Sequence, residues 1–330
     1  MMIEKTGKMH YVKKLFAMAV FCMVISSSVF SQSQVEVFVS EFTQHDLRIM
    51  MEENASALFT EVNDAFSSGR VLELDDRIVL NRFHNPLLEM WENTPFYIPE
   101  DRIIEDAARL TNGYYEMRNI PVYFVDPDGE EHYEEAVLQF SPSGMISEFR
   151  VGLATHRYQE LMRQGLDDID RNNRQEILTF VENFRTSYNR KDLDFIESVF
   201  SDQALIIVGR VLQSTGERSA YADQVEEQVE FLQFSKDEYI DRLRHLFNIN
   251  EWIDVGFEEI EIVRHPRFEE IYGVQLTQYY NSSIYSDVGF LFLLIDFQKQ
   301  DEPMIHVRTW QPQRDTPEMQ RFSIGDLEIL

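Results

Sequence analysis

The stretch ILTFVENFRTSYNRKDLDFIESVFSDQALIIVG, residues 177–209, decides the fold class of this chain. Ile177, Val181, Phe184 and Tyr188 recur at positions i, i+4, i+7 and i+11, which predicts an amphipathic helix that packs against a sheet. A second helix is predicted over residues 191–200, and a strand over residues 204–212. Helices that lead into a sheet are typical of an α+β domain.

The remainder of this half alternates between helix and strand patterns. Ser235 and Glu238 predict a capping box for a helix over residues 236–247, after an acidic, polar stretch at 213–234. Strand patterns follow at 256–265, 271–281, 286–298 and 303–310. Short turns favour antiparallel neighbours among the last three. We therefore expect helices packed on a curved antiparallel sheet that forms a cone, with a ligand pocket at its open end.

The first half has the same order of elements. Helices are predicted from a capping box at Thr43 and Asp46 to about residue 66, over 75–90 and over 98–110, where Pro99 and two acids occupy the first turn. Strand patterns then cover 114–126, 131–140 and 145–153, before a short helix that ends near Gly165. The chain thus predicts two modules in tandem, residues 32–166 and 167–330, joined by the polar run QGLDDIDRNNRQE.

The second half resembles the nuclear transport factor 2-like superfamily, also called SnoaL-like or ketosteroid-isomerase-like. The resemblance covers about residues 171–315 and rests on the first helix, Lys191–Asp192, the short helix LDFIESVF, the run Asp202-Gln203-Ala204, and the strands IYGVQLTQYYNSSIYSDVGFLFLLIDF and IHVRTWQP. These strands are similar to those of exported Bacteroidetes members without an assigned activity. The resemblance implies a cone with a cavity and dimerisation through the sheet, and it implies no catalytic residue, because no family set aligns to positions here. The first half is either a divergent second copy or an unrelated helix-plus-sheet module.

The N-terminus is typical of an export signal. Lys13 and Lys14 precede the apolar run 15–25, and small residues follow it, with a plausible cleavage site after Ser31. The run is shorter than the roughly 20 residues that span a membrane. Phe21 before the only cysteine, Cys22, argues against a lipid anchor, so we expect a periplasmic or secreted protein without cysteine. Either Met1 or Met9 is the start.

The net charge of the chain limits the classes of partner that it can bind. Its 58 acidic and 30 basic residues give a formal net charge of −28, which repels nucleic acid and anionic lipid. A small molecule or an envelope protein is therefore the expected partner. No H-x-H, H-E-x-x-H, phosphate-loop or nucleophile-elbow pattern is present in the sequence, and we expect no metal and no cofactor.

Alternating side chains on the last strands are the candidate site. In MIHVRTWQP, residues 304–312, a regular strand would place His306, Arg308 and Trp310 on one face. Arg308 could hold a carboxylate, or it could meet acids on the outer face while Trp310 is plain core. Asp296 has apolar neighbours, which suggests a partly buried carboxyl or an arginine partner such as Arg308. The complete set of candidates is Gln275, Tyr279, Asp296, His306, Arg308 and Trp310.

Three functions fit these features. The first is an exported, non-catalytic ligand-binding or protein-interaction module of the cell envelope with a cup in its second domain. The second is a cofactor-free isomerase, dehydratase or hydrolase that uses Asp296, His306 or Tyr279 on a small apolar or aromatic substrate. The third is a scaffold that uses the sheet face as its interface. The sequence leaves the ligand, catalysis and oligomeric state open.

Overall fold

The computed structural model describes residues 34–125, 129–163, 169, 171–212, 228–299, 303–313 and 321–329. The predicted export signal, its cleavage site, Cys22 and the predicted boundary between residues 166 and 167 lie outside these residues. Among the helices in the described ranges, none is both long enough and apolar enough to span a membrane.

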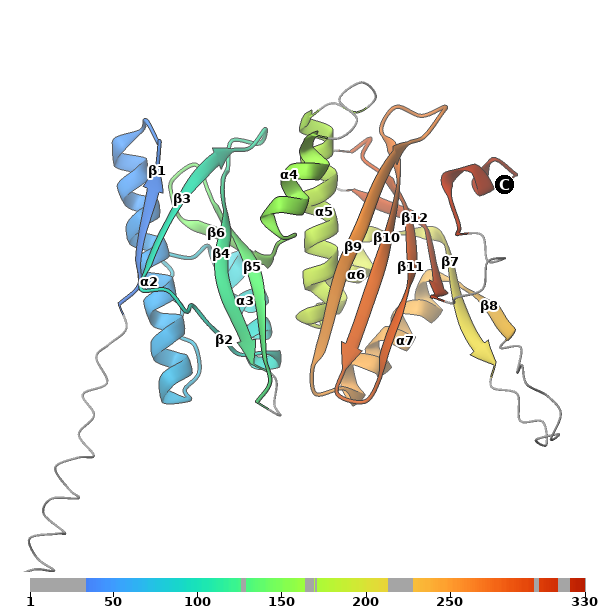
Figure 1. Ribbon diagram of the computed structural model, residues 1–330, viewed down its shortest axis with the longest axis horizontal. Helices are drawn as coiled ribbons and strands as arrows, with labels where there is room; N and C mark the ends of the chain where they lie inside the picture. The colour runs from blue at the N-terminus through green and yellow to red at the C-terminus, as the bar shows by residue number, and fades with distance from the viewer. Residues whose placement is uncertain are drawn as a thin grey trace, which may run out of the picture. The chain divides into compact units, whose positions relative to one another are not determined.

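The described residues of the first half build a six-stranded sheet covered by two helices (Figure 1). One face of α2 (His45–Ser68) buries Met51, Leu58, Phe59 and Val62 against this sheet, as a helical repeat of apolar residues requires. The strand order is β1-β3-β4-β5-β6, with β2 paired to β4. The other elements are β1 (Glu36–Ser40), α3 (Asn81–Asn93), β2 (Phe96–Tyr97), β3 (Arg102–Arg109), β4 (Tyr115–Val125), β5 (Glu131–Phe140) and β6 (Ile146–Val151).

Two predictions for this half are wrong. Residues 98–110 form no helix, because β3 runs parallel to β1 and antiparallel to β4. Its Ile103 is buried while Ile104 is 55 % exposed, which is the two-residue period of a strand. The capping box at Thr43 is also absent, because Gln44 is the residue before α2 and makes no side-chain cap.

The described residues where the two halves meet form two helices. α4 (Thr155–Arg163) confirms the short helix predicted there, and α5 (Arg171–Asn189) confirms the amphipathic helix of the opening stretch. Ile177, Val181, Phe184 and Tyr188 are all buried in the core of the second half. α5 therefore packs with its apolar stripe against the second sheet, as predicted.

The second sheet has the order β8-β7-β12-β11-β10-β9. Its core contains residues of α5, α6 and α7, so these helices share one face of the sheet, called the inner face below. Ser235 and Glu238 form the predicted capping box at the start of α7. The elements are α6 (Leu193–Val199), β7 (Phe200–Leu212), β8 (Gln228–Phe234), α7 (Lys236–Ile249), β9 (Ile253–Arg264), β10 (Ile271–Ser282), β11 (Ser286–Asp296), β12 (Met304–Pro312) and a 3₁₀ helix, η1 (Ile324–Ile329).

The structure confirms the α+β class and corrects two details of this sheet. β8 lies in the stretch 213–234, where no strand was predicted, and it pairs with β7. Neither sheet is purely antiparallel, because β7 pairs in parallel with β12 and β1 with β3. A parallel pair needs a long crossover, and the chain between β7 and β12 supplies one through α7 and the strands β8, β9, β10 and β11.

Candidate functional site

β12 does not place the three predicted site residues on one face. A bulge interrupts its pairing with β11, so that Ile305 pairs with Ile295 and Val307 pairs with Leu294. The extra residue at the bulge is His306, and it shifts the alternation of the strand by one position. His306 consequently lies on the outer face, whereas Ile305, Arg308 and Trp310 lie on the inner face. The shared face expected from regular alternation is therefore wrong for His306.

Arg308 is buried in the inner face with two nitrogens unpaired. It pairs with the core residue Leu293, and 5 % of its surface is exposed. Its guanidinium carbon lies 5.0 Å from the ring centroid of Tyr239. Nε and Nη1 have no hydrogen-bond partner among the described residues. Burial opposes the charge of Arg308, but the phenols of Tyr239 and Tyr188 favour it and raise the net pKa of the guanidinium.

Tyr188 and Tyr239 interact with this arginine, Trp310 follows it on the same face of β12, and Tyr280 interacts with Tyr239. We call Tyr188, Tyr239, Tyr280, Arg308 and Trp310 the inner cluster. The hydroxyls of Tyr188 and Tyr239 form a hydrogen bond of 2.7 Å with each other. The buried hydroxyl of Tyr280 has no partner within the described chain. Burial raises the pKa of Tyr280 to about 12, so it stays a protonated donor at neutral pH.

Trp310 lies beside Arg308 on the same face. It pairs with Leu291 of the core and is half-buried. Gly289 provides room for its ring, because a Cβ added to this glycine would meet an indole carbon at 2.6 Å. The inner cluster thus combines unused N–H and O–H donors with aromatic rings. An unpaired guanidinium N–H group can hold a carboxylate oxygen, and rings can cover the apolar body of the same molecule.

Asp296 pairs with His306 rather than with Arg308. Its Oδ2 lies 3.3 Å from His306 Nε2, and its Oδ1 accepts a hydrogen bond of 2.7 Å from the backbone N–H of Gln298. The His306 side chain is 38 % exposed. The pair therefore lies at the end of β11, on the outer face of the sheet, whereas Arg308 lies on the inner face. The predicted pairing of Asp296 with Arg308 does not form.

Gln275 holds the C-terminal segment on the outer face. Its Nε2 donates to the carbonyl of Phe322 over 2.9 Å, and Gln311 Oε1 accepts from the Phe322 N–H over 3.0 Å. Arg321 lies 3.7 Å from the ring centroid of Phe290. The Gln275 amide is therefore used within the chain.

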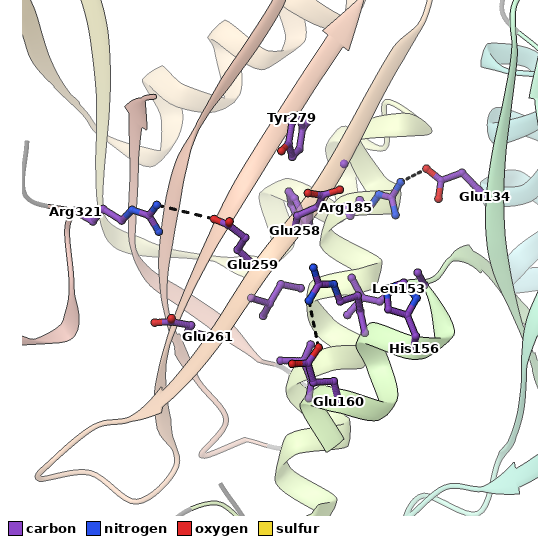
Figure 2. A pocket seen from close by; sticks show the side chains of 16 residues that line it. Glu134, Leu153, His156, Glu160, Arg185, Glu258, Glu259, Glu261, Tyr279 and Arg321 are labelled. Carbon is purple, nitrogen blue, oxygen red and sulfur yellow. Dashed lines mark hydrogen bonds and ion pairs between the residues drawn. The ribbon is translucent and has the colours of Figure 1, made fainter. Parts of the chain in front are cut away.

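Tyr279 belongs to a different cavity, of 730 Å³, which is lined by β9, β10, α4, α5 and β5 (Figure 2). Most of the charges here are paired: Arg185 binds Glu134, Arg157 lies 3.2 Å from Glu160, and Arg321 lies 3.9 Å from Glu259. The charge of Glu258 beside Tyr279 is the main reason why the pKa of this phenol is raised. The tyrosine thus stays neutral, and strand alternation places it on the opposite face of β10 from Tyr280 of the inner cluster.

Glu259 marks a second bulge at this cavity. The pairing of β9 with β10 shifts between Gln275 and Thr277, and Glu259 has a φ of 49°, which non-glycine residues rarely adopt. Thr277 Oγ1 donates to its carboxylate over 2.8 Å. The bulge turns this carboxylate toward Thr277 and Arg321, as Figure 2 shows for Arg321.

Within the described ranges, no three His, Cys, Asp or Glu side chains are placed to hold a metal ion.

Comparison with known proteins gives structural similarity only. No protein-family model and no curated protein matches the chain. An NTF2-like protein from Cytophaga hutchinsonii is similar over 42 % of this chain and 98 % of its own, at 12 % identity and a TM-score of 0.31. Naphthalene 1,2-dioxygenase with indole in its active site is similar over 50 % of this chain and 91 % of its own, at 10 % identity and a TM-score of 0.36.

A third similar structure is Bd1075 from Bdellovibrio bacteriovorus, at 14 % identity and a TM-score of 0.33. That match covers 52 % of this chain and 46 % of Bd1075, less than half of its length. Similarities of this size say nothing about activity or ligand. The solved structures that are similar to this chain include a member of the family that its second half resembles.

Proposed function

We propose that this chain is an exported, non-catalytic ligand-binding protein of the cell envelope. Its ligand is a small molecule with a carboxylate or a similar anionic group, held by Arg308 on the inner face of the second sheet. The observation that carries the proposal is the buried guanidinium with two unpaired nitrogens. An unpaired buried charge costs a protein several kcal/mol, so a group that binds it has a large driving force.

The inner cluster also suggests the body of the ligand. Tyr188, Tyr239 and Trp310 offer ring surface next to the guanidinium, and Tyr280 offers a further hydroxyl. A flat or apolar molecule with one acidic group uses each of these features. An aromatic carboxylate is therefore the simplest probe.

The alternative, a cofactor-free isomerase, dehydratase or hydrolase, needs an acid or base beside the bound ligand. Asp296 and His306 pair on the outer face, and Tyr279 lies in the acid-lined cavity. None of the three shares the inner cluster with Arg308. Binding without chemistry is thus the simpler proposal for this face.

Thermal-shift measurements test the proposal. Benzoate should raise the melting temperature of the protein, and benzamide, its neutral analogue, should not. Arg308→Ala should lose the benzoate response, and Trp310→Ala should reduce it. Arg210→Ala is the matched control, because Arg210 pairs with Glu230 on an exposed part of β7.

An equal benzoate response in Arg308→Ala would overturn the proposal, and so would an equal response to benzamide. If benzoate gives no shift, a panel of aliphatic, aromatic and sterol-like carboxylates extends the test, and failure of the whole panel counts against it. The expected homodimer through the sheet is a separate proposal. Light scattering of the wild-type protein tests it.

A further inference from the structure

The polar face of α5 lines a cavity of 970 Å³. Asn172, Gln175, Glu176, Thr179 and Asn183 follow one another at helical spacing and lie on the side of the helix away from its apolar stripe. In a single helix on a sheet such a face would meet solvent. Here the first half of the chain adds Thr111, Asn112 and Gln139 to the lining. The second half adds Phe195 and Ser198 from α6, Phe297 after β11 and Met304 at the start of β12. We call this cavity the α5 pocket.

The lining of the α5 pocket is rich in hydrogen-bonding groups and poor in charge. About a quarter of all residues in the chain are charged, yet Glu176 is the one charged side chain among the described lining residues. Carboxamides, which both donate and accept, dominate the polar part. They are Asn112, Gln139, Asn172, Asn173, Gln175 and Asn183, joined by the hydroxyls of Thr111, Thr179 and Ser198.

Several of these groups are already fixed by the protein. Thr111 Oγ1 donates to Glu176 over 3.1 Å, Asn173 Nδ2 donates to the Tyr272 hydroxyl over 2.8 Å, and Gln139 Oε1 accepts from Ser147 over 3.1 Å. By contrast, the half-buried amides of Gln175 and Asn183 form no hydrogen bond to any other described residue. Such amides are available to a ligand without loss of internal bonds.

An apolar wall completes the lining. The rings of Phe180 and Phe297 meet edge to face with centroids 5.9 Å apart, and Phe195 is half-buried beside the polar groups. A ligand that suits this pocket has many hydroxyls, no net charge and a C–H face that can cover aromatic carbon. Anions find no cationic side chain among the described lining residues, and cations find only Glu176, which Thr111 already binds.

We propose that the α5 pocket binds a neutral saccharide, with the free amides of Gln175 and Asn183 as its specific contacts. Sugar hydroxyls donate and accept in the same way as carboxamides, and the C–H face of a pyranose ring covers apolar surface. This site shares no lining residue with the inner cluster, so the two proposals stand or fall separately.

Isothermal titration with neutral tetrasaccharides tests the proposal. The probes are maltotetraose, cellotetraose and tetra-N-acetylchitotetraose, and tetragalacturonate is the charged comparison. We expect at least one neutral probe to bind and tetragalacturonate to bind more weakly. The double variant Gln175→Leu with Asn183→Leu should weaken binding about tenfold or more, because it removes two amide partners.

Gln159→Leu is the matched control, because Gln159 carries an exposed amide on α4 outside the pocket. The affinity of this variant for the saccharide should equal that of wild type. Benzoate at saturating concentration should not compete, which separates this site from Arg308. If the double variant has a lower melting temperature than wild type, Asn112→Ala takes its place and should also weaken binding. Asn112 lines the pocket but is exposed in a turn outside the core. The proposal is wrong if no neutral probe binds, if the double variant binds as tightly as wild type, or if tetragalacturonate binds best.

Discussion

Arg150 Nε on β6 donates to a Glu182 carboxylate oxygen on α5 over 3.1 Å, and both side chains are completely buried. Arg150 also contacts Glu116 at 2.5 Å, and Arg118 binds both glutamates. The Leu153 N–H donates to Glu182 over 2.7 Å. This buried network joins the first sheet to the helix that packs on the second sheet, and the arginines hold the pKa of Glu182 below its usual value despite its burial.

Replacing Glu182 by glutamine should destabilise the protein strongly. The amide removes the negative charge while Arg118 and Arg150 stay buried, which costs about 3–5 kcal/mol in the free energy of unfolding. Urea denaturation measures this loss. Glu160→Gln is the control, because its pair with Arg157 is exposed and contributes less than about 1 kcal/mol. Equal losses for the two variants would show that the network does not stabilise the junction.

Removal of the Tyr188 hydroxyl should cost stability, and removal of the Tyr280 hydroxyl should not. Tyr188→Phe removes the hydroxyl that bonds Tyr239 over 2.7 Å and also bonds Arg308, a loss of about 1–3 kcal/mol. Tyr280→Phe removes a hydroxyl that has no partner among the described residues, so its stability should equal or exceed that of wild type. Thermal denaturation of the two variants compares them directly, and the reverse order would contradict this description of the inner cluster.

Alkaline pH should destabilise the folded chain. Burial raises the pKa of Tyr158 and of Tyr280 to about 12, above the value of about 10 in an unfolded chain. The folded state therefore holds more protons between these values, and stability falls as pH rises from about 10 to about 12. Urea midpoints measured across this range test the sign. The double variant Tyr158→Phe with Tyr280→Phe should show a shallower fall, and an unchanged slope would exclude these tyrosines as the cause.

Local patterns in the sequence predicted the elements that depend on them. The apolar stripe of α5, the capping box at Ser235 and the three antiparallel strands β10, β11 and β12 follow from spacing and turn residues, and all are confirmed. β3 could not be predicted in this way. Its acids and alanines favour a helix, and its strand conformation depends on pairing with β1, more than sixty residues earlier.

The candidate site was predictable only where the strand is regular. Alternation correctly placed Arg308 and Trp310 together, but the bulge at His306 leaves no mark in the sequence. The sequence placed Tyr188 on the apolar stripe of one predicted helix and Tyr239 in another. Their contact with Arg308 depends on how these two helices pack against the sheet. The α5 pocket needs the first half of the chain to cover a polar helix face, which no local pattern reports.

The most direct test of the Arg308 proposal is the free energy of unfolding of Arg308→Met without ligand. A buried residue whose function is to bind a ligand lowers the free energy of unfolding of the protein while the ligand is absent. Burial of a guanidinium with two unpaired nitrogens costs several kcal/mol, and we expect its hydrogen bonds to Tyr188 and Tyr239 and its contact with the Tyr239 ring to offset only part of that cost. Urea denaturation should therefore find Arg308→Met at least as stable as wild type and unresponsive to benzoate. A loss of 1 kcal/mol or more, roughly the net value of a typical hydrogen bond, would make Arg308 a structural residue and contradict its assignment to a ligand.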